Sequence, residues 1–162
     1  MLPQAYCRPG ADATTRWRPP ASTDTLRDVN ADLLSPIRAP FRALAQAFVP
    51  ETATCTPAEW AELERIVAEA LASRPAAMQR QALLFIRVLD ALARLRYGRP
   101  LPDLEASRRT ALLEAIGNAP VLLLRRGVWG LRTLVMMGYY AQPGVQGAIG
   151  YRATAAGWET RR

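Results

Sequence analysis

An apolar stripe at helical spacing through residues 75–97 constrains the fold more than any other feature of the sequence. The stripe consists of Met78, Ala82, Phe85, Ile86, Leu89, Leu92 and Ala93, which share one face of a helix. The arginines of this segment, Arg80, Arg87, Arg94 and Arg96, lie largely off that face. Gly98 and Pro100 then follow in the order typical of a helix end. We expect this helix to form the centre of a helical core.

Four further helices are expected around it. The first covers residues near 36–48, and the second begins at Thr56, with Pro57 in its first turn and Glu59 completing a capping box. The fourth runs from about 104 to 116, and the fifth from 120 to about 139. The fifth is apolar on all sides, so we expect it to be buried on most sides, with Gly127 and Gly130 allowing close helix packing. Since no strand pattern appears, the sequence predicts an all-α, single-domain bundle of about five helices.

The segments that flank this bundle have a different composition. Residues 1–35 are predicted to form an extended N-terminal arm, residues 36–140 the helical domain, and residues 141–162 an aromatic, Gly/Pro-rich tail that packs on a partner. The arm is rich in proline and has only isolated large apolar side chains. It is either a floppy tail or a segment that becomes ordered along a partner, with Tyr6 and Trp17 as anchors.

The end of the fifth helix carries more aromatic and glycine residues than a helix exit requires. The run from Leu131 ends in Gly138, and the tyrosines and tryptophan that follow are Tyr139, Tyr140, Tyr151 and Trp158. Buried tyrosine and tryptophan need an apolar surface on one side and a hydrogen-bond partner on the other. We expect a second protein to supply that surface, with Pro143 and Gly150 shaping the loop. The alternative is that these rings close the chain's own core.

The charge of the chain points to a second class of function. Lys and Arg together number 21 against 14 acids, which gives a formal net charge of +7, and every cation is an arginine. A basic helical regulatory or nucleic-acid-binding module would need these arginines on one face. They are scattered through the sequence without a run of three, so we expect no nucleic-acid partner.

Residues for catalysis are largely missing. The chain has no histidine, which removes the commonest general base and metal ligand. Its two cysteines, Cys7 and Cys55, could form a disulfide or remain as thiols, but they cannot build a zinc site alone. No glycine-rich loop follows a strand, which argues against a dinucleotide or P-loop site. We therefore expect no catalytic, cofactor-binding or metal-binding residues in this chain.

No membrane or export segment is expected either. The charge-free stretch from Thr133 to Tyr151 is long enough to span a bilayer, but one proline and several glycines interrupt it. The first thirty residues contain no apolar core typical of a secretory signal. The expected compartment is the cytoplasm, or the periplasm if the chain is exported with a partner or has lost a leader.

The order of these features resembles the gluconate 2-dehydrogenase subunit 3 type, the small subunit of FAD-dependent dehydrogenases. The resemblance rests on Leu131–Leu134, Gly138–Tyr140, Pro143, Ile149–Tyr151 and Trp158, and it extends more loosely over residues 37–158. It implies a non-catalytic helical subunit in an obligate heteromer with a large flavoprotein of the glucose–methanol–choline (GMC) type, which oxidises a sugar or alcohol hydroxyl. FAD would be bound by the large subunit, and the small one would stabilise or mature it in a chaperone-like role.

Overall fold

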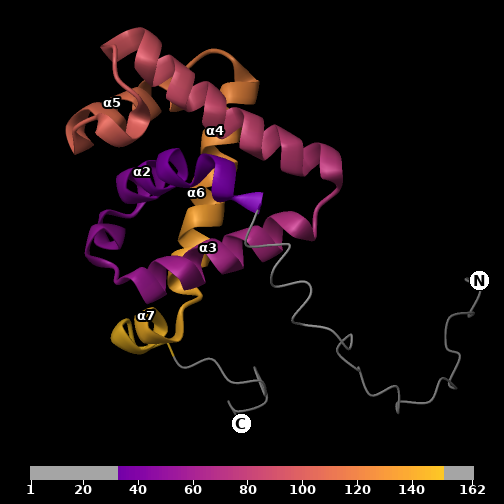
Figure 1. The fold of residues 1–162 in the computed structure, drawn as a ribbon, viewed down its shortest axis with the longest axis vertical. Coiled ribbons are helices and arrows are strands. Elements are labelled where there is room, and N and C mark those ends of the chain that lie inside the picture. Colours follow the sequence, from indigo (N-terminus) through magenta and orange to yellow (C-terminus); the bar gives the residue numbers. More distant parts are fainter. Residues whose placement is uncertain (1–32, 152–162) are drawn as a thin grey trace, which may run out of the picture.

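The computed structural model describes residues 33–151, and this part of the chain is built from helices and contains no strand (Figure 1). The α-helices are α2 (Arg38–Phe48), α3 (Pro57–Ala72), α4 (Ala76–Tyr97), α5 (Ala106–Gly117), α6 (Leu122–Tyr140) and α7 (Pro143–Ala148). Short 3-10 turns precede or follow them at η1 (Ser35–Ile37), η2 (Pro50–Thr54) and η3 (Leu101–Asp103). The predicted all-α fold with about five main helices is confirmed.

The core lies where α2, α3 and α6 meet. The helix pair α3 and α6 has the most extensive contact in the described range, and α5 packs on both α6 and α2. Figure 1 shows α2 and α3 crossing in front of the longer α6. Phe41 and Leu44 of α2, Leu63 of α3 and Val135 of α6 are completely buried at this junction. Burial of each such side chain contributes roughly 1.5–3 kcal/mol.

The expectation that the helix at residues 75–97 forms the centre of the core is wrong. Only Ile86, Leu89 and Ala93 of α4 are buried, while Met78, at the start of the predicted stripe, is exposed. Figure 1 shows α4 lying across one end of the molecule. An amphipathic pattern identifies one buried face, but it does not say how deeply the helix lies. Here neighbouring helices cover α4 on one side.

The expectation that the fifth helix is buried on most sides is also wrong. In α6 the buried residues are Val128, Leu131, Val135 and Gly138, which lie along one face, whereas Leu123 is 76% and Trp129 is 72% exposed. The two glycines singled out from the sequence differ. A Cβ on Gly127 would lie 2.5 Å from the ring of Phe85, so this glycine allows α4 and α6 to meet, but Gly130 has no atom within 4 Å of that position.

Charged residues fix the relative positions of α2 and α3. Glu64 of α3 is buried, and its carboxylate accepts a 2.6 Å hydrogen bond from Nε of Arg42 and lies 3.2 Å from Nε of Arg38. Arg42 also stacks over the ring of Trp60, with 5.1 Å to the ring centroid. At the start of α3, the capping box predicted from Thr56 and Glu59 is present, and it satisfies backbone N–H groups that the helix leaves unpaired.

Candidate partner interface

The outward face of α6 is an apolar stripe. It follows i, i+4, i+7 spacing and consists of Leu122, Arg126, Trp129, Gly130, Thr133, Met137 and Tyr140, all of which are exposed. Arg126 supplies the stripe's one charge. Apart from Tyr140, the stripe has one side-chain hydroxyl, that of Thr133. This hydroxyl donates a 2.9 Å hydrogen bond to the carbonyl of Trp129 and is thereby satisfied within the helix. This face offers few polar groups for water to bind. It is therefore better suited to contact with another protein than to exposure to solvent.

The position of this stripe follows from how closely α6 approaches α3. A Cβ on Gly138 would lie 2.8 Å from Cγ2 of Val67 and 3.1 Å from the carbonyl oxygen of Leu63. Glycine is therefore required at this contact, and it fixes which side of α6 faces inward. The apolar run ends at Gly138, while the helix itself continues to Tyr140, close to the predicted end at about residue 139. The glycine is a packing residue inside the helix.

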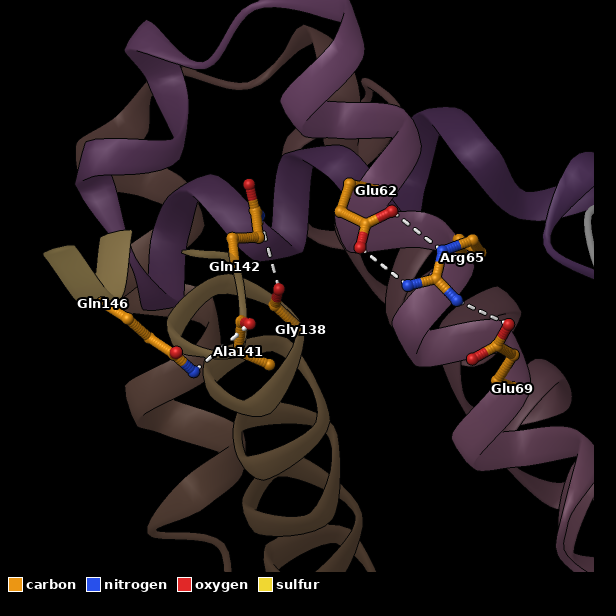
Figure 2. A network of polar contacts seen from close by, with 7 residues as sticks. All are labelled: Glu62, Arg65, Glu69, Gly138, Ala141, Gln142 and Gln146. Atoms are coloured by element: carbon orange, nitrogen blue, oxygen red, sulfur yellow. Dashed lines mark hydrogen bonds and ion pairs between the residues drawn. The ribbon is translucent and has the colours of Figure 1, made fainter. Parts of the chain in front are cut away.

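A buried glutamine holds the corner between α6 and α7. The side chain of Gln142 is 4% exposed, and its Nε2 donates a 3.3 Å hydrogen bond to the carbonyl of Gly138. Beyond it, Nε2 of Gln146 donates a 3.3 Å hydrogen bond to the carbonyl of Ala141 (Figure 2). Pro143 occupies the first turn of α7, where its missing N–H is not needed. These contacts give α7 a fixed direction within the segment that the sequence predicted to be an aromatic, Gly/Pro-rich tail.

The two adjacent tyrosines at the end of α6 have different surroundings. Tyr139 is partly buried and packs against the core, whereas Tyr140 is exposed. Their rings meet edge to face with centroids 5.2 Å apart. Burial raises the pKa of the Tyr139 phenol above its ordinary value, with smaller contributions from nearby Cys55 and Glu51. Tyr139 thus helps to close the chain's own core, while Tyr140 is free to contact another molecule.

An open groove of about 370 Å³ runs along these tyrosines. It is lined by Glu51, Glu59, Tyr139, Tyr140, Gly144, Val145, Ala148 and Ile149. Hydrogen bonds from the backbone N–H and hydroxyl of Thr56 lower the pKa of Glu59, so its carboxylate is charged at neutral pH. The groove therefore offers an apolar floor with acids at one side, which suits an apolar side chain followed by a cation.

The structure brings together only some of the residues predicted to contact a partner. Tyr140 and Pro143 lie at the α6–α7 corner, with Tyr139 partly beneath them. Gly150 follows α7 with a φ of +71°, a conformation that suits glycine, and the side chain of Tyr151 is exposed beside it. The other two predicted anchors, Trp17 and Trp158, fall outside residues 33–151, as does Cys7.

Three residues of this site, two exposed and one buried, were not predicted from the sequence. Trp129 and Met137 were assigned to a buried helix, and Gln142 was not considered. Apolar residues all around a helix can mean that the chain's own core surrounds it. They can equally mean that another protein covers one side. A lone glutamine between two apolar segments gives no comparable signal, because its burial depends on the turn that follows.

Chemistry within the chain is limited over the described residues. Between residues 33 and 151, no three His, Cys, Asp or Glu side chains gather as metal ligands. No helix in the same range has the length and apolar character to cross a bilayer. Burial and the nearby Glu59 raise the pKa of the Cys55 thiol, which keeps this group protonated and weakly nucleophilic at neutral pH.

Exposed apolar side chains along the outer face of a helix are typical of proteins that work in assemblies. The comparison with known families is specific: a model described as gluconate 2-dehydrogenase subunit 3 matches residues 38–157, and the chain belongs to this family. It is therefore an accessory subunit of a dehydrogenase complex with a heteromeric partner. No curated protein and no solved structure gives a significant match.

Proposed function

We propose that this chain is the non-catalytic small subunit of an FAD-dependent oxidoreductase of the GMC type. Its large partner would oxidise a sugar or alcohol hydroxyl, and the two would form an obligate heteromer. The small subunit would stabilise the large one, or help it to mature, by covering an apolar part of its surface. Family membership supports the assignment to a dehydrogenase complex, and the apolar outward face of α6 supports the mode of association.

The outward face of α6 carries the proposal. Trp129, Met137 and Tyr140 lie on it, and the exposed Ile149 and Tyr151 extend the apolar surface beyond α7. Aromatic side chains supply most of the binding energy in interfaces of this kind. Interfaces of obligate complexes often bury more than about 2,000 Å², so one helix face would be only part of the contact. The predicted anchors Trp17 and Trp158 are candidates for the remainder.

FAD would be held by the large subunit. A dinucleotide site of the common kind needs a strand, a glycine-rich turn and a helix N-terminus in succession. The described residues form helices without a strand, and the groove beside Tyr140 has acidic residues at its rim, which would repel a pyrophosphate. The residues present therefore do not fit the cofactor, and we assign no step of flavin chemistry to this chain.

The proposal is tested by co-expression with a GMC-type flavoprotein from the same genome. Tyr140→Ala combined with Tyr151→Ala removes two exposed rings, so we expect a clear loss of large subunit recovered through a tag on the small one. Flavin absorbance of the eluate measures the recovery. Arg65→Ala, on the outward face of α3, is the matched control and should leave recovery unchanged. Full recovery of a flavin-bearing complex with the double variant would contradict the proposal.

A further inference from the structure

The outward face of α4 has a second pattern that the core does not use. Six of its exposed residues alternate at spacings of four and three along the helix, namely Ala77, Gln81, Leu84, Val88, Ala91 and Leu95. This spacing is that of the seam in a two-stranded coiled coil, where positions a and d face the neighbouring helix. Five of the six are apolar, and Leu95 is 84% exposed. A lone α4 has no need of such a seam on its solvent side.

The one polar residue of the seam is also typical of coiled coils. With Ala77, Leu84 and Ala91 at d, the a positions are Gln81, Val88 and Leu95. A single polar side chain at an a position weakens association but fixes the register and the number of helices that pair. Gln81 therefore separates Ala77 from the continuously apolar part of the seam, which begins at Leu84.

The two edges of this seam differ in charge. Arg80 and Arg87 lie seven residues apart immediately before seam positions Gln81 and Val88, which places them at the g positions that flank a coiled-coil seam. Arg94 continues the row and pairs with Asp90 at 3.0 Å. Within residues 33–151 no acidic side chain pairs with Arg80 or Arg87. One edge of the seam is therefore a row of cations open to a neighbour.

The opposite edge is apolar and belongs partly to this chain's own core. Phe85 and Leu92 are partly buried there, and the ring of Phe85 covers Gly127 of α6. A helix that docks on α4 thus meets arginines along one edge only. The small side chains of Ala77 and Ala91 in the seam allow that helix to approach closely.

We propose that the seam of α4 binds an amphipathic helix of another protein, and that this helix carries acidic residues along the edge facing Arg80 and Arg87. A second copy of this chain would not offer acidic side chains to Arg80 and Arg87. In an antiparallel pair the arginine edges would face each other, which is unfavourable. In a parallel pair they would face the apolar edge of Phe85 and Leu92, which offers no acid.

The seam also fits a protein helix better than a lipid surface or a nucleic acid. Helices that lie in membranes have a broad apolar face with tryptophan, phenylalanine or leucine, whereas this seam is narrow and includes Gln81 and two alanines. Nucleic acid would contact the arginines but would leave Leu84, Val88 and Leu95 exposed to water. A single helix with an apolar face and acidic residues along one edge complements both the narrow, largely apolar seam and its cationic edge.

The test uses the full chain and two designed helical peptides, each about three heptads long. Both have leucine at a and d. One has glutamate at every e and g position, so that either orientation offers acids to the arginines, and the other has lysine there. We expect the acidic peptide to bind at least about tenfold more tightly in fluorescence anisotropy. Arg80→Glu with Arg87→Glu should reverse this preference.

Further variants separate the seam from the rest of the molecule. Leu84→Gln with Leu95→Gln should abolish binding of the acidic peptide, while circular dichroism shows an unchanged melting curve because both side chains are exposed. Trp129→Ala on α6 should not alter peptide binding, so failure of this proposal is distinguishable from failure of the proposed α6 interface. Equal affinity for the two peptides, or no binding of either, overturns the proposal. Self-association of the chain through α4, or binding of anionic vesicles or duplex DNA that Arg80→Glu with Arg87→Glu abolishes, overturns it as well.

Discussion

Helices α3 and α6 pack on each other through similar inner faces, yet their outer faces differ sharply. Both inner faces are apolar and tightly packed, with Val67 of α3 beside Gly138 of α6. On the outer face of α3, Arg65 bridges Glu62 and Glu69 at 2.7 Å and 2.6 Å (Figure 2). The outer face of α6 carries exposed apolar side chains instead.

This difference separates a surface suited to water from one that we propose to be covered by a partner protein. The ion pairs on α3 hold their charges in solvent, and each contributes only about 0.3–0.5 kcal/mol. They serve solubility more than stability. The apolar residues on α6 contribute little to the fold because they are exposed, so their presence there is explained by what covers them. The N-termini of the two helices differ as well. Helix α3 begins with a capping box, whereas α6 begins after Val121, which provides no side-chain cap.

The largest expected effect is on association. Trp129→Ala removes the most exposed aromatic ring of α6 and should weaken binding of the large subunit by about 2–4 kcal/mol, or at least thirtyfold in Kd. The free energy of unfolding of the isolated chain should change by less than about 0.5 kcal/mol, because the ring is exposed. Titration of the immobilised small subunit with its partner measures the first, and urea denaturation the second. If Trp129→Ala lowered the stability of the chain but not its affinity for the partner, the outer face of α6 would not be a binding surface, and its contrast with α3 would have no functional meaning.

A smaller effect is expected on the inner contact. Gly138→Val places side-chain atoms where the backbone of Leu63 cannot move away, and should destabilise the chain by about 2 kcal/mol. Gly130→Ala is the matched control on the same helix, where the space is open, and should stabilise by up to about 1 kcal/mol. Urea denaturation of both variants gives the values. Equal stability of the two would mean that α3 and α6 are not closely packed at Gly138.

The smallest effect concerns the capped start of α3. Thr56→Ala removes the hydroxyl that donates a 2.9 Å hydrogen bond to the Glu59 carboxylate and accepts a 3.3 Å one from the Glu59 N–H, but it keeps the backbone N–H bond to that carboxylate. The substitution should lower Tm by about 3 °C at pH 7. Because the folded-state pKa of Glu59 lies below its ordinary value, this stabilisation is complete above that ordinary value. The part that depends on the charged carboxylate is lost as pH falls through the folded-state pKa, so the difference in Tm between parent and variant should narrow in acid. A remainder should persist, because the N–H of Glu59 has lost its hydroxyl acceptor at every pH. Melting curves at several pH values measure the difference, and a constant gap down to about pH 3 would contradict this assignment.

Much of the fold could be predicted because its signals are local. Thr56, Pro57 and Glu59 define the start of α3 within four residues, and Gly98 ends α4 in the left-handed conformation that such glycines adopt. What could not be predicted depends on distant parts of the chain. The depth of α4 and the exposed side of α6 are decided by which helices pack together, and periodicity carries no information about that choice.

The segment that carries the candidate site could be predicted from the sequence, but which of its side chains are exposed could not. The aromatic residues after Gly138 indicated a partner surface, and the structure leaves Tyr140 and Tyr151 exposed. Tyr139 differs from its neighbour because the helical rotation of one residue turns it toward the core. The contribution of Trp129 could not be recognised, because apolar residues occur all around α6 and do not indicate which of its sides faces the core.

The buried amide of Gln142 has a consequence for the speed and lifetime of the assembly. Since it ties α7 to the end of α6 within the free chain, that segment has lost its conformational freedom before a large subunit arrives. Association then orders fewer residues, and the entropy lost at the encounter is smaller. In the heteromer that we propose, this saving would raise the affinity, and gains in affinity appear mostly as slower dissociation.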